Sequence, residues 1–92
     1  MSERNSFQNY VITFKASARK ELDNLEKFIA FKIDKKLQDL VAGLANVDLK
    51  KMQGYVSTYR MRCGDYRIIF EDHRTTITIL VIKVGHRKDV YE

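Results

Sequence analysis

Three arginines lie close together in the middle of the sequence, and their spacing points to phosphate chemistry. Arg60 and Arg62 are separated by one residue, and Arg67 follows shortly after. Side chains alternate along a β-strand, so Arg60 and Arg62 would share one face roughly 7 Å apart, close to the spacing of adjacent phosphates on an extended nucleic-acid strand. A single arginine is usually a solvated surface residue. Crowding several on neighbouring strands costs stability, which predicts an anionic ligand.

The C-terminal segment, residues 85–92, carries further polar groups that could act together with these arginines. Arg87 and Lys88 would extend the basic surface just beyond the last strand. A histidine is a surface residue by default, but the place of His86 at the edge of the basic face makes it a candidate for proton transfer.

Two tyrosines and the single cysteine have less specific interpretations. Tyr91 would either close the edge of the core or stack on a base, and Tyr55 has the same two interpretations. Cys63 falls on the apolar face of its strand and is expected to pack against the core. The sequence has no metal-ligand spacing of His, Cys and carboxylate residues and no glycine-rich phosphate loop. We therefore expect neither a metal nor a cofactor.

The composition is that of a small globular domain with a basic surface. A second core would not fit in 92 residues, so we expect one domain over residues 1–92. The net charge of +5 favours nucleic acid or an acidic protein as partner, and a membrane surface is the weakest choice. One cysteine excludes an internal disulfide and fits a reducing cytoplasm. We expect a cytoplasmic protein without a signal peptide or a membrane span.

The apolar patterns in the first half predict one strand followed by two helices. Residues 10–14 are β-branched and aromatic and read as a strand. Ser17 offers an N-cap for the first helix. Phe28 and Phe31 widen the apolar stripe near an expected break, and residues 33–44 repeat with helical spacing.

From Lys50 onward the pattern changes to a period of two. The Gly64-Asp65 pair predicts a tight hairpin turn, although in the reverse of the most favoured order. A second turn is expected at residues 72–74. Residues 76–84 form the longest strand, which should be interior because its later half is apolar on both faces. The expected fold is α+β in the order β-α-α-β-β-β, with an antiparallel meander and a helical hairpin packed on one face of the sheet.

The motifs in the second half resemble one known family. The segments KMQG (residues 51–54), YRMRCGDYRIIFE (residues 59–71) and VGHRKDVY (residues 84–91) are similar to those of the RelE branch of the RelE/ParE toxin superfamily. The resemblance covers nearly the whole chain in length and element order, and its specific part is the C-terminal half.

This resemblance implies a toxin of a type II toxin–antitoxin system. Members of this branch enter the ribosomal A site and cut mRNA without a metal, by attack of a ribose 2′-hydroxyl that leaves a 2′,3′-cyclic phosphate. It also implies a cognate antitoxin that wraps the toxin, and hetero-oligomers formed by the two. The catalytic set would match Arg60, Arg62, Arg67, Arg87 and Tyr91, and the further residues expected to bind RNA are Lys51, Tyr55 and Lys88.

One departure from the family concerns the general base. The best-studied members carry lysines at the positions of Arg60 and Arg62, and lysine can lose its proton whereas arginine effectively cannot. The two arginines are therefore expected to stabilise charge in the transition state. The base would be His86 in the first place, then Tyr91, and more remotely Lys51.

Two other functions remain open. A ParE-like toxin would share the fold but act on DNA gyrase, and the GHRKDVY tail argues against it because ParE chains typically lack that run. A non-catalytic module of the same fold would only bind RNA or protein, and the arginine-for-lysine change keeps this interpretation open.

Overall fold

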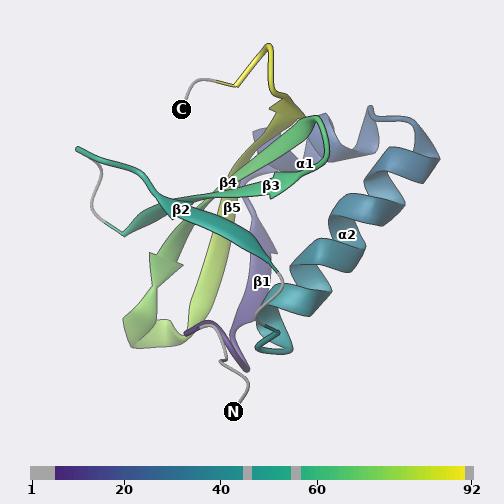
Figure 1. Cartoon of the computed structure of the whole chain (residues 1–92). Helices are drawn as coiled ribbons and strands as arrows, with labels where there is room; N and C mark the ends of the chain where they lie inside the picture. The colour runs from purple at the N-terminus through teal and green to yellow at the C-terminus, as the bar shows by residue number, and fades with distance from the viewer. Residues whose placement is uncertain (1–5, 45–46, 55–56, 91–92) are drawn as a thin grey trace.

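The computed structural model describes residues 6–44, 47–54 and 57–90, and these form a five-stranded sheet with two helices. The sheet order is β1-β5-β4-β3-β2, in which β1 is parallel to β5 and the other neighbours are antiparallel (Figure 1). This confirms the expected α+β fold and its meander, but the expected order β-α-α-β-β-β lacked one strand, formed by residues 48–51 at the edge of the sheet. In chain order the elements are β1 (Val11–Phe14), α1 (Ala16–Asp23), α2 (Lys27–Val41), β2 (Asp48–Lys51), β3 (Thr58–Cys63), β4 (Tyr66–His73), the 3-10 helix η1 (Arg74–Thr76) and β5 (Thr78–His86).

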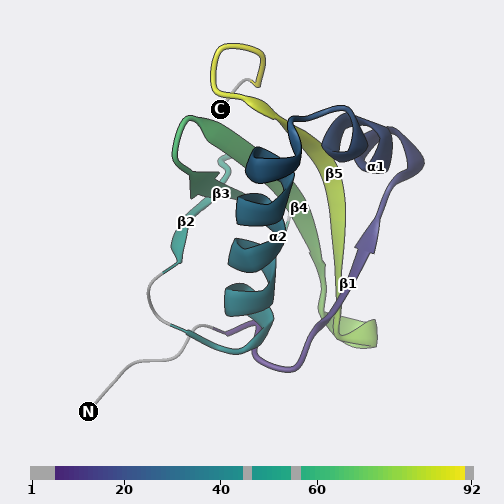
Figure 2. The ribbon, with the colours of Figure 1, turned by 90° about the vertical axis from the view of Figure 1, so that its right-hand side faces the viewer.

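The helices differ from expectation at their boundaries. The first begins at Ala16, so the expected N-cap at Ser17 is wrong and Ser17 lies inside the helix. Lys15 is the N-cap instead, because it remains extended and donates its backbone N–H to the carbonyl of Val81 of β5. The break comes at residues 24–26 rather than near Phe31, since Glu26 is extended. Phe28 and Phe31 are therefore 60% and 68% exposed and do not join the core stripe. Figure 2 shows α2 lying across one face of the sheet and α1 beside β5.

The second turn also differs from expectation. β4 continues through His73, and the chain reverses in η1 and at Ile77, which adopts a left-handed φ of 48°. Asp72 belongs to the strand because its N–H donates to the carbonyl of Ser57 and its carboxylate accepts from Arg74. β5 accordingly begins at Thr78 and lies between β1 and β4, which explains why it is apolar on both faces.

A β-bulge interrupts the pairing of β4 with β5. Ile69 lies opposite Lys83, but Phe70 lies opposite Val81, so Ile82 has no partner in the register. An extra residue of this kind exchanges the two faces of a strand beyond it. Val81 and Val84 can consequently both be buried although they are three residues apart.

The core lies between the sheet and the helices. Ile33, Leu37 and Leu40 of α2 are fully buried against Met61 and Phe70 of the sheet. An aromatic group of Phe7, Tyr10, Tyr59 and Phe70 fills the end of the sheet where the chain enters it, with ring centroids 5.2–5.6 Å apart. This packing fixes which face of β3 points inward, and so which face carries the arginines.

Candidate nucleic-acid interface

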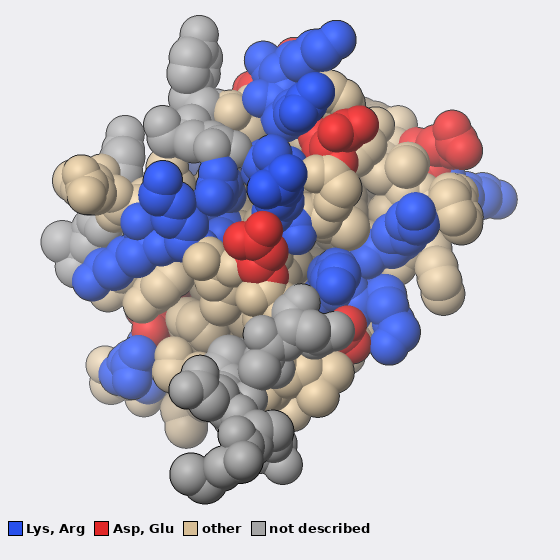
Figure 3. Space-filling model, in the orientation of Figure 1, with Lys and Arg blue, Asp and Glu red and all other residues tan. Residues whose placement is uncertain are grey.

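The strand β3 separates apolar from basic side chains in the way its sequence predicts. Tyr59, Met61 and Cys63 pack on the core side. Arg60 and Arg62 therefore occupy the opposite side of the sheet, which we call the outer face. Figure 3 shows Lys and Arg side chains gathered on the side of the molecule where β2 and β3 lie.

The register brings a third arginine to the same face. Arg62 of β3 lies directly opposite Arg67 of β4, and directly opposite residues in an antiparallel pair share a face. Arg62 is half-exposed, and its guanidinium is 3.8 Å from the carboxylate of Asp48. An exposed ion pair of this length contributes little, so the side chain can turn toward a ligand.

Arg67 differs from the other arginines because it is buried, with only 6% of its surface exposed. Its Nη1 donates to the carbonyl oxygens of Gly64 at 2.9 Å and of Tyr66 at 3.0 Å. These bonds brace the turn between β3 and β4. Gly64 has a φ of +58°, whereas Asp65 is not among the residues with positive φ, a pattern typical of a type II′ turn with glycine first. The order Gly64-Asp65, the reverse of the most favoured Asp-Gly, is therefore the order that a type II′ turn requires.

The same turn also holds the C-terminal segment. The N–H of Arg87 donates to the carbonyl oxygen of Asp65 at 2.7 Å, and Nε of Arg87 is 3.8 Å from the Asp65 carboxylate. The side chains of Arg87 and Asp65 are both more than half exposed. The structure therefore brings Arg87 to the turn that Arg67 braces, although the two lie far apart in sequence.

His86 lies on the helix side of the sheet, across from Arg60 and Arg62. It is directly opposite Tyr66, whose ring packs against the core side, and the two rings meet edge to face at 5.3 Å. The Nδ1 atom of His86 accepts the backbone N–H of Lys88 at 3.2 Å. The bulge in β5 accounts for this placement, because without it His86 would point to the outer face.

The structure locates the remaining predicted residues only in part. Lys51 lies opposite Tyr59 and is exposed, and Lys88 is exposed in the turn after β5. Tyr55 and Tyr91 lie outside the described residues. Within residues 6–44, 47–54 and 57–90 no three His, Cys, Asp or Glu side chains come together to hold a metal ion. Neither helix in the same ranges is long and apolar enough to cross a membrane.

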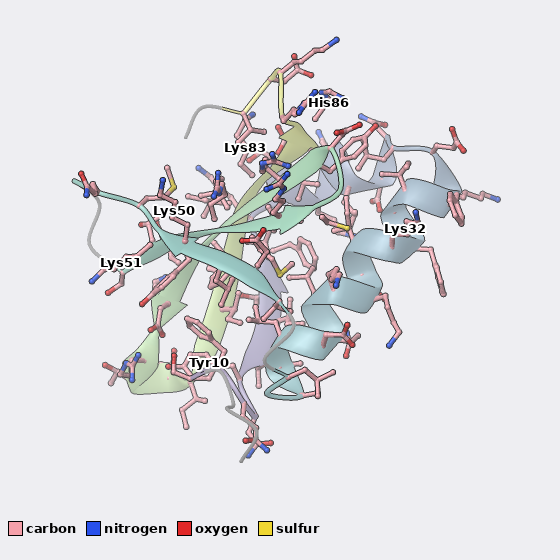
Figure 4. All side chains as sticks on the ribbon, viewed as in Figure 1. Tyr10, Lys32, Lys50, Lys51, Lys83 and His86 are labelled. Carbon is pink, nitrogen blue, oxygen red and sulfur yellow. The ribbon has the colours of Figure 1, made fainter. Side chains whose placement is uncertain are left out.

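The sequence did not single out Lys50, which the structure places at the site. The pairing of β2 with β3 puts Lys50 directly opposite Arg60. Leu49 packs toward the core, so its neighbour Lys50 points to the outer face. Figure 4 shows Lys50 and Lys51 extending from β2, well away from His86 at the end of β5. The sequence could have predicted the place of Lys50 beside Arg60 only if residues 48–51 had been recognised as a strand that pairs with β3.

A groove lies on the other side of the molecule, between α2 and the β3–β4 turn. It has a volume of about 490 Å³ and combines apolar side chains with three lysines. Burial raises the pKa of the Cys63 thiol at its edge, while the nearby charges of Lys36 and Lys32 act in the opposite direction. The groove is lined by Ile29, Phe31, Lys32, Lys35, Lys36, Cys63, Gly64, Asp65 and Tyr66.

Comparisons with known proteins agree with this fold. Toxin RelE3 of Methanocaldococcus jannaschii is 44% identical over 46 residues, which are 50% of this chain and 50% of that relative. The match thus spans about half the length of that protein. Toxin RelG of Mycobacterium tuberculosis is 25% identical over 83 residues, covering 89% of this chain and 95% of the relative.

Solved structures and a family model extend the comparison over most of the chain. A chain of the RelB–RelE antitoxin–toxin complex from Methanococcus jannaschii superposes with a TM-score of 0.70 and 30% identity, covering 85% of this chain and 93% of that one. Residues 12–91 match the family described as the ParE toxin of type II toxin–antitoxin system, parDE. The chain therefore belongs to the ParE toxin family of type II toxin–antitoxin systems and, within the RelE/ParE superfamily, to its RelE branch.

Proposed function

We propose that this toxin is a ribosome-dependent, metal-independent endoribonuclease that cuts mRNA and so inhibits translation. The observation that carries the proposal is the meeting of basic side chains around one turn. Arg62 and Arg67 lie opposite each other, and Asp65 of the same turn binds the backbone of Arg87. Such a concentration of guanidinium groups suits a phosphate whose charge grows during a reaction.

In the proposed reaction the ribose 2′-hydroxyl attacks the adjacent phosphate, and the 5′-oxygen leaves. The product is a 2′,3′-cyclic phosphate, so the chain need not supply a nucleophile. Arg60 and Arg62 would stabilise the negative charge that gathers on the non-bridging oxygens. Removal of one such donor typically lowers kcat by about 10²–10³-fold.

The other predicted residues have supporting roles in this proposal. Arg87 is only loosely paired with Asp65, so its guanidinium can reach a phosphate brought to the turn. Arg67 holds the turn through the carbonyls of Gly64 and Tyr66. Tyr91 would orient the substrate. A role for His86 in proton transfer stays a prediction, and its place on the helix side requires the RNA to reach around the end of the sheet.

Binding to the ribosome would rest on the wider basic surface. Lys51, Lys88 and Tyr55 are proposed to contact mRNA or ribosomal RNA. Each phosphate that such cations neutralise releases counterions, so the affinity should fall steeply as salt is added. The net charge of +5 agrees with this mode of binding.

We also propose that a cognate antitoxin neutralises this toxin. The support is the similarity to chains found in RelB–RelE antitoxin–toxin complexes. The groove beside α2 offers apolar side chains rimmed by Lys32, Lys35 and Lys36. Phe31, which lines the groove, and Phe28 of the same helix are exposed. An acidic amphipathic segment would cover both features.

A second candidate function is inhibition of DNA gyrase. The observation that favours it is the match to the ParE toxin family over residues 12–91. The resemblance of the GHRKDVY tail to the RelE branch favours mRNA cleavage instead. The fold by itself does not decide between these targets.

Expression of the toxin in growing cells, followed by mapping of mRNA 5′ ends and plasmid supercoiling, tests the proposal. Codon-phased cuts within translated regions are the expected result. Loss of supercoiling with intact mRNA would identify a gyrase inhibitor. If neither effect is seen, the chain is a binding module without catalytic activity.

A further inference from the structure

We propose that Lys50 is the general base that accepts the proton of the attacking 2′-hydroxyl. This inference rests on the proposed ribonuclease function and supplies the group that its reaction lacks. Neither Arg60 nor Arg62 can take a proton near neutral pH, since a guanidinium does not lose its own. A lysine amine can act as a base once it is neutral.

The register of β2 against β3 places Lys50 correctly for this role. Lys50 lies directly opposite Arg60, and such pairs in antiparallel sheets have Cβ atoms about 4.5–5.5 Å apart. Two long side chains on one face can therefore reach the same phosphate and its neighbouring ribose. Lys50 is exposed, and none of the described carboxylates forms an ion pair with it.

The charged groups around Lys50 are mostly cations. Arg60 and Arg62 face it from β3, and Arg67 follows on β4. Asp48 is on the same side of β2, but its carboxylate faces Arg62 at 3.8 Å. Glu71 on β4 instead contacts His73 at 2.9 Å. An array of cations with one deprotonatable member is suited to hold a phosphate and to remove a proton beside it.

The other candidates are less well placed. His86 lies on the helix side of the sheet, and its Nδ1 already accepts the N–H of Lys88. Lys51 lies opposite Tyr59, whose ring packs on the core side, so Lys51 leaves β2 in the other direction from Lys50. Lys83 of β5 also falls on the outer face, because it lies opposite Ile69, which lies opposite Arg60. Its Nζ is 2.9 Å from the carboxylate of Glu21, however, whereas Lys50 forms no ion pair with a described carboxylate and lies directly opposite Arg60.

The proposed step balances without a further reactant. The neutral Nζ of Lys50 takes the proton from the 2′-oxygen, and the 2′-oxygen forms a bond to phosphorus. The bond between phosphorus and the 5′-oxygen breaks, and the 5′-oxygen takes a proton from solvent. Lys50 ends the step as an ammonium and returns the proton to solvent.

Single-turnover cleavage of mRNA on programmed ribosomes, measured as a function of pH, tests this role. Lys50→Arg keeps the charge but cannot accept the proton, so the single-turnover rate constant at saturating toxin should fall about 10²–10⁴-fold. The toxin concentration that gives half the maximal rate should change little. The variant should also lose the dependence of the wild-type rate on pH that a proton-accepting side chain produces. Lys20→Arg on α1, at another exposed lysine, is the matched control and should cleave like the wild type.

Exchange of the two opposite residues gives a sharper result. The double variant Lys50→Arg with Arg60→Lys returns one lysine to the pair and should regain cleavage together with its pH dependence. Cleavage by Lys50→Arg at the wild-type rate and pH profile would overturn the role of Lys50 while leaving the ribonuclease function intact. Absence of cleavage by the wild-type chain would overturn both.

Discussion

Replacement of Arg67 by methionine should weaken the fold as well as any catalysis. The guanidinium is buried, and its Nη1 donates to the carbonyls of Gly64 and Tyr66. Hydrogen bonds from a charged donor contribute about 1.5–3 kcal/mol each, and water can partly replace them at a turn. We therefore expect the free energy of unfolding to fall by about 2–3 kcal/mol for the pair.

Urea denaturation followed by circular dichroism measures this loss directly. A change of about 2 kcal/mol should lower the midpoint by roughly 1–2 M urea. Arg62→Met is the matched control, because Arg62 is half-exposed and only 3.8 Å from Asp48, so it should cost less than about 1 kcal/mol. Equal midpoints for Arg67→Met and the wild type would refute the bracing role of Arg67.

Three further predictions concern groups whose surroundings the structure defines. Burial raises the pKa of the Cys63 thiol, so alkylation should reach half its maximal rate at a higher pH than for free cysteine, and a lower pH would contradict this. Burial and then the hydrogen bond to Asp72 raise the pKa of Tyr10. The contribution of Tyr10 to stability is complete below its unfolded-state pKa of about 10 and is lost as the pH rises through its folded-state pKa. Urea titrations above a pH of about 10 should therefore show a steeper loss of the free energy of unfolding with pH for the wild type than for Tyr10→Phe, and equal slopes would contradict this. Gly43 has a φ of +82°, and an added Cβ would lie 2.9 Å from Gln8, so thermal unfolding of Gly43→Ala should show a loss of about 1–3 kcal/mol. Gly54→Ala, with similar φ but open space, should lose less, and equal losses would contradict the steric argument.

Much of the fold was predictable because the apolar pattern and the core agree. The alternation in β3 predicted which side chains face inward, and Tyr59, Met61 and Cys63 do so. The Gly64-Asp65 pair predicted the hairpin turn. These are local signals, since strand periodicity and turn chemistry depend on few residues.

The missed features depend on pairing between distant segments. β2 has four residues, of which only Leu49 is apolar, so its own sequence gives little sign of a strand. Its pairing with β3 nevertheless brings Lys50 to the site. The bulge opposite Ile69 and Phe70 turns His86 to the helix side. The sequence of β5 contains no residue that would have predicted this bulge. The helix boundaries also differ from those predicted by the helical pattern. Lys15, bonded through its backbone to β5, and Glu26, which is not helical, set the starts of α1 and α2.

Cleavage by the purified toxin in vitro is the most direct test of the central claim. The same mRNA would be offered free and bound to ribosomes stalled at a known codon, and the new ends would be mapped and their chemistry determined. The proposed function predicts a cut within the A-site codon on the ribosome only, with a 2′,3′-cyclic phosphate at the new 3′ end. An intact message on the ribosome, or equal cleavage of the free RNA, would contradict it.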